Sequence, residues 1–118
     1  MPEGPEVEHT SRILRELENK IIRTIQLTEL SQKYNKYKNK NAEFSEFSEC
    51  TLNRIERQGK FILFRFSNNK VILNHLGMSG KWVLTKYKKT ISELKHPKVI
   101  ITTENPRTLA IFDDARNF

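Results

Sequence analysis

Residues 59–76 read GKFILFRFSNNKVILNHL, and this stretch indicates the class of the fold. Two runs rich in aromatic and β-branched residues, KFILFRF and KVILNHL, stand on either side of a short polar piece. Such runs favour β-strands. A serine followed by two asparagines is typical of a hairpin turn. The stretch therefore predicts two adjacent antiparallel strands.

Further strand-like runs surround this hairpin. IIRTIQLTEL alternates in polarity, and CTLNRIERQ, GKWVLTKY, KVIITTE and TLAIFDD are separated by turn-like pieces such as QG, GMSG and ENPR. Six or seven short strands at this spacing are typical of an antiparallel sandwich or barrel. The chain shows no internal repeat and no linker, so we expect one mostly β domain over residues 1–118.

The amino-terminal sequence predicts a helix over about residues 5–20. Pro5 suits the first helical position, because its missing N–H would be unpaired there in any case. Acidic residues follow in the first turn, where the helix dipole favours them. An apolar face recurs at roughly helical spacing. Its members are Val7, Ile13, Leu14, Leu17 and Ile21.

Two polar segments follow the first strand. SQKYNKYKNKN, at residues 31–41, is typical of a solvated loop. Its tyrosines among lysines also fit a contact with nucleic acid, which stays open as the alternative. AEFSEFSE, at residues 42–49, predicts a short helix or a turn.

The composition narrows the class of ligand that the protein is expected to bind. The 118 residues contain 21 Lys and Arg against 14 Asp and Glu, a net charge of +7. Such a surface attracts polyanions, of which nucleic acid is the usual one; a basic protein that is merely soluble is the alternative.

Cys50 is the single cysteine, which excludes an intramolecular disulfide and a cysteine metal site. We see no membrane-spanning run and no signal peptide, so we expect an intracellular protein that stays with the DNA and is not secreted.

Four pieces, MPEGPEVEHTSRIL, RQGKFILFRF, NHLGMSGKW and DDARNF, occur in this order. Together they resemble the amino-terminal domain of the formamidopyrimidine-DNA glycosylase and endonuclease VIII family, over essentially the whole chain. The resemblance implies a two-layered antiparallel β-sandwich flanked by helices. It also implies a bifunctional enzyme of base-excision repair. Such an enzyme removes an oxidised base and then cuts the DNA strand by AP lyase chemistry.

The resemblance assigns the chemistry to the amino terminus. Pro2 matches the nucleophile, whose α-amine is exposed once Met1 is removed. An α-amine has a pKa near 8, against about 10.4 for lysine, so much more of it is unprotonated at neutral pH. Glu3 resembles the general acid–base residue, and Glu6 resembles a supporting acid. The alternative is that both acids only complement the start of a helix.

The resemblance also implies a DNA-binding set. Lys60 matches a lysine of the catalytic site that contacts a phosphate beside the flipped nucleotide, and His75 matches a second phosphate contact. Met78, Arg116 and Phe118 resemble the three residues that fill the space left by the flipped base. Ordinary core packing is the alternative for Met78, and a frayed chain end is the alternative for Phe118.

The pattern departs from the family after Phe118. Members continue into a helix–two-turns–helix domain and, in most cases, a zinc finger, so we expect no metal or other cofactor in this chain. The expected partner is double-stranded DNA with an oxidised base or an abasic site, bound by a monomer without a membrane. PEGPE favours oxidised pyrimidines; HLGM with Arg116 and Phe118 favours oxidised purines, which we prefer. The alternative is a DNA-binding module without catalysis, or a fragment that is inactive by itself.

Overall fold

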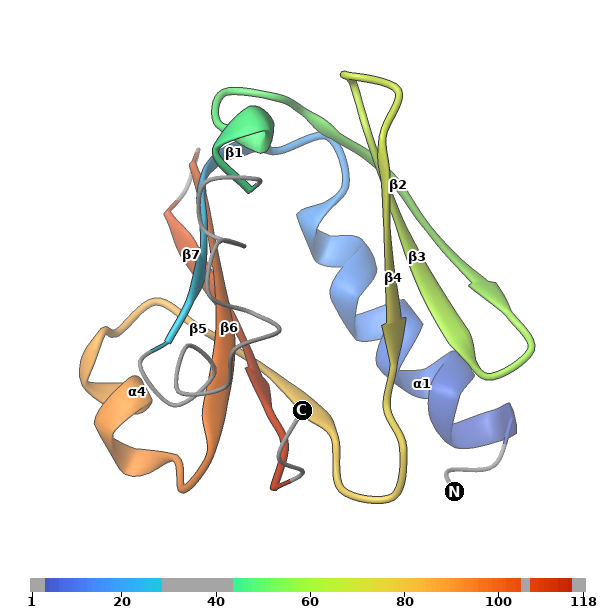
Figure 1. The fold of residues 1–118 in the computed structure, drawn as a ribbon, viewed down its shortest axis with the longest axis vertical. Coiled ribbons are helices and arrows are strands. Elements are labelled where there is room, and N and C mark those ends of the chain that lie inside the picture. The colour runs from blue at the N-terminus through green and yellow to red at the C-terminus, as the bar shows by residue number, and fades with distance from the viewer. Residues whose placement is uncertain (1–3, 29–43, 105–106, 116–118) are drawn as a thin grey trace.

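The computed structural model describes residues 4–28, 44–104 and 107–115. Its strands form two antiparallel sheets that face each other (Figure 1). One sheet has the order β1-β6-β7-β5 and the other the order β2-β3-β4, which confirms the predicted sandwich. The strands are β1 (Ile21–Leu27), β2 (Leu52–Gln58), β3 (Phe61–Phe66), β4 (Val71–His75), β5 (Lys81–Thr85), β6 (Pro97–Glu104) and β7 (Thr108–Asp113).

The stretch that predicted a hairpin forms β3 and β4, which pair in antiparallel register. Ile62 and Phe64 turn into the core, where they are 0% and 1% exposed. The turn between the strands places Asn69 at φ 66°, a left-handed conformation that asparagine tolerates better than most residues. The Asn68 side-chain oxygen accepts a hydrogen bond from the Lys70 N–H at 3.0 Å. Local chemistry therefore sets this turn.

The predicted helix over residues 5–20 is shorter than expected. α1 spans Gly4–Leu14 and continues as a single 3-10 turn, η1, over Arg15–Leu17. The chain then reverses at Asn19, which has φ 69°. The Asn19 N–H donates to the Leu52 carbonyl at 2.7 Å, so a hydrogen bond to β2 replaces the last helical turn.

The core lies between the two sheets and includes one face of the helical segment. Leu14 and Leu17 are fully buried there. An aromatic row joins the sheets: the ring of Trp82 on β5 lies 5.4 Å from Phe64 on β3 and 5.1 Å from Phe112 on β7. These side chains fix how the two sheets and α1 sit against one another.

Two short helices complete the described fold. η3 (Ser45–Phe47) confirms the short helix or turn expected there, and Phe47 packs on the core. α4 (Lys89–Glu93) was not predicted, because a helix of this length carries almost no periodic signal. It lies on the outer side of the four-stranded sheet, where Ile91 and Leu109 line the same pocket (Figure 1). No helix in these ranges is long and apolar enough to cross a membrane.

Two phenylalanines of β3 offer a matched test of this packing. Replacing buried Phe64 by Ala should lower the free energy of unfolding by roughly 3–5 kcal/mol, because it leaves a cavity beside Trp82. Phe61→Ala is the control, since Phe61 is 45% exposed, and its loss should be much smaller. Urea unfolding followed by Trp82 fluorescence measures both. Equal losses would contradict the described core.

Candidate functional site

The described candidate residues lie at one end of the sandwich (Figure 1). Glu6 is in the first turn of α1, and Lys60 is in the turn between β2 and β3. His75 is the last residue of β4, and Met78 lies in the loop that follows it. The remaining sequence predictions lie outside the described residues: Pro2, Glu3, Arg116 and Phe118.

Lys60 is presented by a glycine turn. Gly59 before it has φ +59°, a left-handed conformation that suits glycine. The Lys60 side chain is exposed and makes no ion pair or hydrogen bond with any described residue. Its ammonium group is therefore available to an anionic ligand.

His75 stands beside that turn on the neighbouring strand. It is paired in register with Phe61, the residue after Lys60. The His75 and Phe61 rings lie 5.1 Å apart with planes tilted by 43°. His75 is half-buried, so its ring is oriented by this contact and still reaches the surface. The sheet thus brings Lys60 and His75 to the same edge of the molecule.

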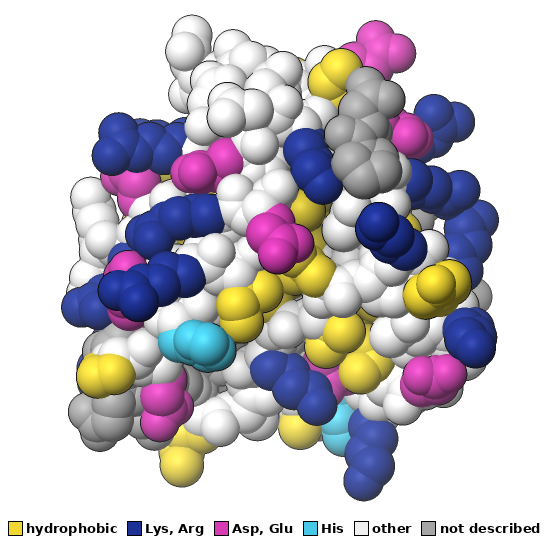
Figure 2. All heavy atoms as spheres, turned by 180° about the vertical axis from the view of Figure 1, so that it is seen from behind, with side chains coloured by type: hydrophobic (Ala, Val, Ile, Leu, Met, Phe, Trp, Pro, Cys, Tyr) yellow, Lys and Arg dark blue, Asp and Glu magenta, His cyan; other side chains and the backbone are white. Residues whose placement is uncertain are grey.

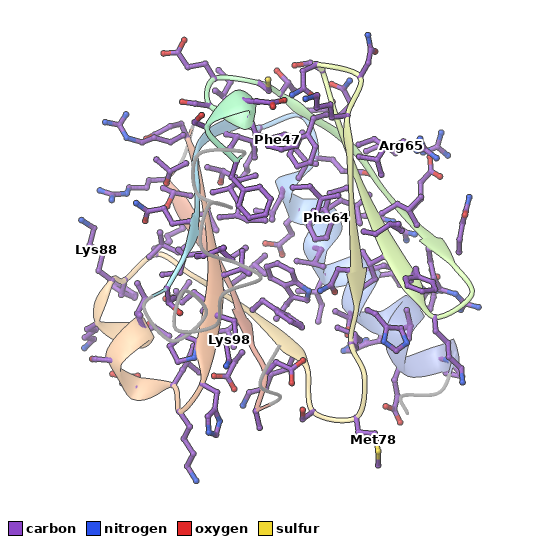
Figure 3. The ribbon with its side chains drawn as sticks, in the orientation of Figure 1. Phe47, Phe64, Arg65, Met78, Lys88 and Lys98 are labelled. Carbon is purple, nitrogen blue, oxygen red and sulfur yellow. The ribbon has the colours of Figure 1, made fainter. Side chains whose placement is uncertain are left out.

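Met78 is not a core residue, because 83% of it is exposed. In Figure 3 its side chain points away from the body of the fold. The loop around it is nevertheless tightly built. Gly77 has φ +61°, and the Gly80 N–H donates to the Leu76 carbonyl at 2.8 Å. A Cβ at Gly80 would lie 2.3 Å from the Leu76 oxygen and 2.8 Å from the Phe112 ring, so glycine is required there.

A carboxylate holds α1 to the β2–β3 hairpin. Glu8 lies 3.4 Å from Arg12, 3.4 Å from Arg15 and 3.9 Å from Arg57 at the end of β2. Partial burial acts to raise the pKa of the Glu8 carboxyl, but the charges and hydrogen bonds of Arg15 and Arg12 outweigh it and lower this pKa. Glu8 therefore stays ionised and fixes the first turns of α1 beside the Lys60 turn.

The comparisons with known proteins agree with this geometry. The family model described as the formamidopyrimidine-DNA glycosylase N-terminal domain matches residues 1–118. The chain belongs to this family. The match confirms the resemblance drawn from the sequence.

Individual glycosylases show the same relationship. Formamidopyrimidine-DNA glycosylases from Lactiplantibacillus plantarum and Ligilactobacillus salivarius are 32% and 36% identical to the whole chain. A solved structure of a mutant Lactococcus lactis Fpg, in complex with a Fapy-dG containing DNA, superposes with a TM-score of 0.79 at 25% identity. That match covers 99% of this chain and 41% of the solved one. The chain spans about 41% of the length of the two glycosylase relatives.

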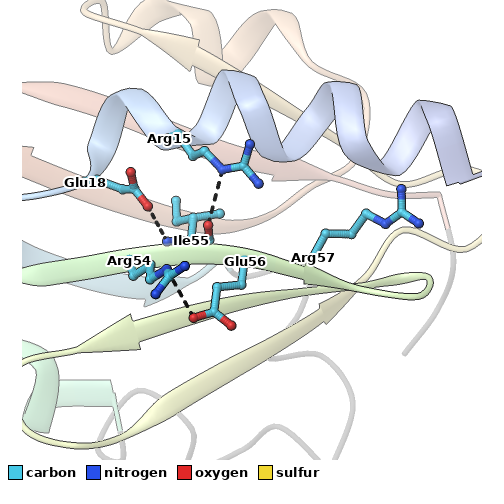
Figure 4. A pocket seen from close by; sticks show the side chains of 6 residues that line it. All are labelled: Arg15, Glu18, Arg54, Ile55, Glu56 and Arg57. Atoms are coloured by element: carbon cyan, nitrogen blue, oxygen red, sulfur yellow. Dashed lines mark hydrogen bonds and ion pairs between the residues drawn. The ribbon is translucent and has the colours of Figure 1, made fainter.

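A polar pocket of about 440 Å³ lies between the helical segment and β2 of this glycosylase-family domain (Figure 4). Both backbone groups of Ile55 are hydrogen-bonded there to side chains of the helical segment. Its N–H donates to the Glu18 carboxylate at 2.7 Å, and its carbonyl accepts from Arg15 at 3.3 Å. Arg54 lies 3.3 Å from Glu56. We read the pocket as an anchor for the helix, because the charges within it are matched by partners.

Sequence reasoning missed this anchor. The Glu18–Ile55 bond spans 37 residues and the Arg15–Ile55 bond spans 40, so no local motif could reveal them.

Charged side chains are spread over the back face of the molecule. Lys and Arg side chains lie on both of its sides, with Asp and Glu among them (Figure 2). On that face the excess positive charge does not form a single patch.

Glu8 gives a pH test of the helix anchor in this glycosylase-family fold. A carboxyl whose folded pKa is lowered contributes stability above its unfolded pKa and loses it as pH falls through the folded value. Glu8→Gln should therefore be less stable than the wild type at pH 7; the difference should begin to shrink near the ordinary glutamate pKa of about 4.3 and should vanish only below the lower pKa of folded Glu8. Thermal unfolding across pH measures it. Glu16→Gln, on the exposed side of η1, should show little change; a difference between Glu8→Gln and wild type that is independent of pH would contradict the ionic anchor.

Proposed function

We propose that residues 1–118 are the catalytic domain of a bifunctional DNA glycosylase. It removes an oxidised base from double-stranded DNA and then cleaves the strand at the resulting abasic site. The observation that carries the proposal is that the β2–β3 turn with Lys60, the end of β4 with His75 and the β4–β5 loop with Met78 all lie at the same end of the sandwich as the start of α1. Family membership over the whole chain supports it. The domain acts as a monomer and without a metal ion of its own.

The chemistry begins at the amino terminus, directly before α1 in the sequence. With Met1 removed, the Pro2 amine attacks the sugar C1′; the glycosidic bond breaks, and the departing base keeps the electron pair and takes up a proton. The amine then gives up its proton, its lone pair forms the C1′=N bond as the C1′–O4′ bond breaks, and Glu3 protonates the released ring oxygen. The resulting iminium is cationic and accepts electrons when a C2′ proton leaves. The C3′–O bond then breaks by β-elimination, and water finally releases Pro2.

The DNA is held and opened by the other residues. Lys60 and His75 bind phosphates that flank the flipped nucleotide. Unstacking and unpairing a base costs a few kcal/mol, and Met78 with Phe118 recovers part of this by filling the space. Arg116 bonds the opposite base. Oxidised purines of the formamidopyrimidine or 8-oxoguanine type are the favoured lesions.

Borohydride trapping tests the nucleophile. Protein whose loss of Met1 is confirmed by mass is mixed with duplex DNA carrying one abasic site and reduced. A covalent adduct that maps to Pro2 is expected, because the reduced iminium cannot hydrolyse. Protein that keeps Met1 is the control and should give no adduct. DNA binding without any adduct in the processed protein would refute the glycosylase proposal for this chain and favour a binding module.

Salt dependence tests the phosphate contact of Lys60. Lys60→Ala should weaken binding to all duplexes alike and reduce the slope of log K against log salt by about 1. Lys70→Ala is the matched control. Lys70 follows the turn at the opposite end of β3, and its ammonium group is paired with Glu46. A fluorescence anisotropy titration at several salt concentrations measures both slopes. Equal slopes for the two variants would contradict a phosphate contact at Lys60.

A further inference from the structure

One hydrogen bond joins the Met78 loop to a distant part of the chain. The Ser79 hydroxyl donates to the Asp114 carboxylate at 2.6 Å, across 35 residues of sequence. Ser79 is the residue after Met78, and Asp114 is the residue after β7. The bond therefore connects the loop between β4 and β5 to the chain that leads towards Arg116 and Phe118.

Asp114 is firmly placed. Its side chain is fully buried, and its N–H donates to the His96 carbonyl at 3.0 Å. The His96 N–H in turn donates to the carboxylate of Asp113 at 2.8 Å. A buried carboxylate is costly unless it is hydrogen-bonded, and a hydroxyl bonded to a carboxylate at 2.5–2.7 Å is of the stronger, charge-assisted kind. Asp114 is thus a fixed point to which the loop is attached.

The loop between β4 and β5 needs a fixed attachment if Met78 is to stay exposed. Met78 exposes 83% of its apolar side chain. A flexible loop would let this side chain fold back and bury itself on the surface. Leu76, buried at 3% exposure, fixes the loop at its start, and the close approach of Gly80 to Phe112 fixes it at its end. The Ser79–Asp114 bond holds the position next to Met78 itself.

We propose that Asp114 is a positioning residue: through its hydrogen bond with Ser79 it holds Met78 in the outward position. The inference rests on the proposed function, because it concerns how the space left by a flipped base is filled. The bond ties the loop that carries Met78 to a buried carboxylate at the end of β7.

The positioning of Met78 has a readout that needs no catalysis. The chain contains two methionines, so after removal of Met1 a methyl-¹³C-methionine label reports on Met78 alone. Ser79→Ala should move and sharpen this NMR signal towards that of a free methionine side chain, and Ser79→Thr should restore it. Ser92→Ala is the matched control, because it removes a hydroxyl that bonds the Lys89 carbonyl at 2.7 Å on α4. An unchanged Met78 signal in Ser79→Ala would overturn the inference.

Activity separates positioning from general loss of structure. Ser79→Ala should lower kcat/KM for base excision from duplex DNA by about tenfold, the effect of losing a hydrogen bond to a charged group. Trapping on a single-stranded abasic oligonucleotide, which has no opposite base to contact, should change less than twofold. An equal loss on both substrates would overturn the inference. If the wild type forms no adduct, the proposed function fails, while the Met78 signal still decides the positioning.

Discussion

The burial of Leu14 and Leu17 between the sheets is the constraint on which the rest of the site depends. Each side chain is fully buried, and burying a leucine contributes roughly 1.5–3 kcal/mol. α1 therefore cannot slide or rotate without opening the core. Its fixed direction brings Glu8 to Arg57 and sets the first turn of the helix beside the β2–β3 turn. Packing in the interior thus determines where the first turn of α1 lies relative to the β2–β3 turn.

Surface groups at this end of the sandwich are held by constrained backbone. Lys60 follows a left-handed glycine, and Met78 follows another, Gly77. Glycine at these positions lets the chain turn sharply and leaves the next side chain facing outwards. Binding groups that are held in place before the ligand arrives lose less conformational entropy on binding. This end of the sandwich therefore combines exposed side chains with a rigid support.

Local patterns in the sequence predicted the antiparallel strands and the hairpin, because alternation and turn residues act over a few positions, while the choice of a sandwich over a barrel came from the family resemblance. The end of α1 was not predictable in this way, since Asn19 leaves the helix to bond the Leu52 carbonyl on a distant strand. The resemblance to the glycosylase family singled out Lys60, His75 and Met78, and the fold shows them at one end. Neither route could reveal the Ser79–Asp114 bond, which exists only once β4, β5 and β7 are assembled.

The pairing of β1 with β6 has a consequence for how the chain folds. Ile25 lies opposite Ile101, so the first strand finds its neighbour only near the end of residues 1–118. Contacts between residues far apart in sequence slow folding, because a long loop must close before they form. The β2-β3-β4 meander, by contrast, needs only short turns. We expect the meander to form first and β1 last, so pulse-labelling hydrogen exchange should protect amides of β3 before those of β1. Simultaneous protection would contradict this order.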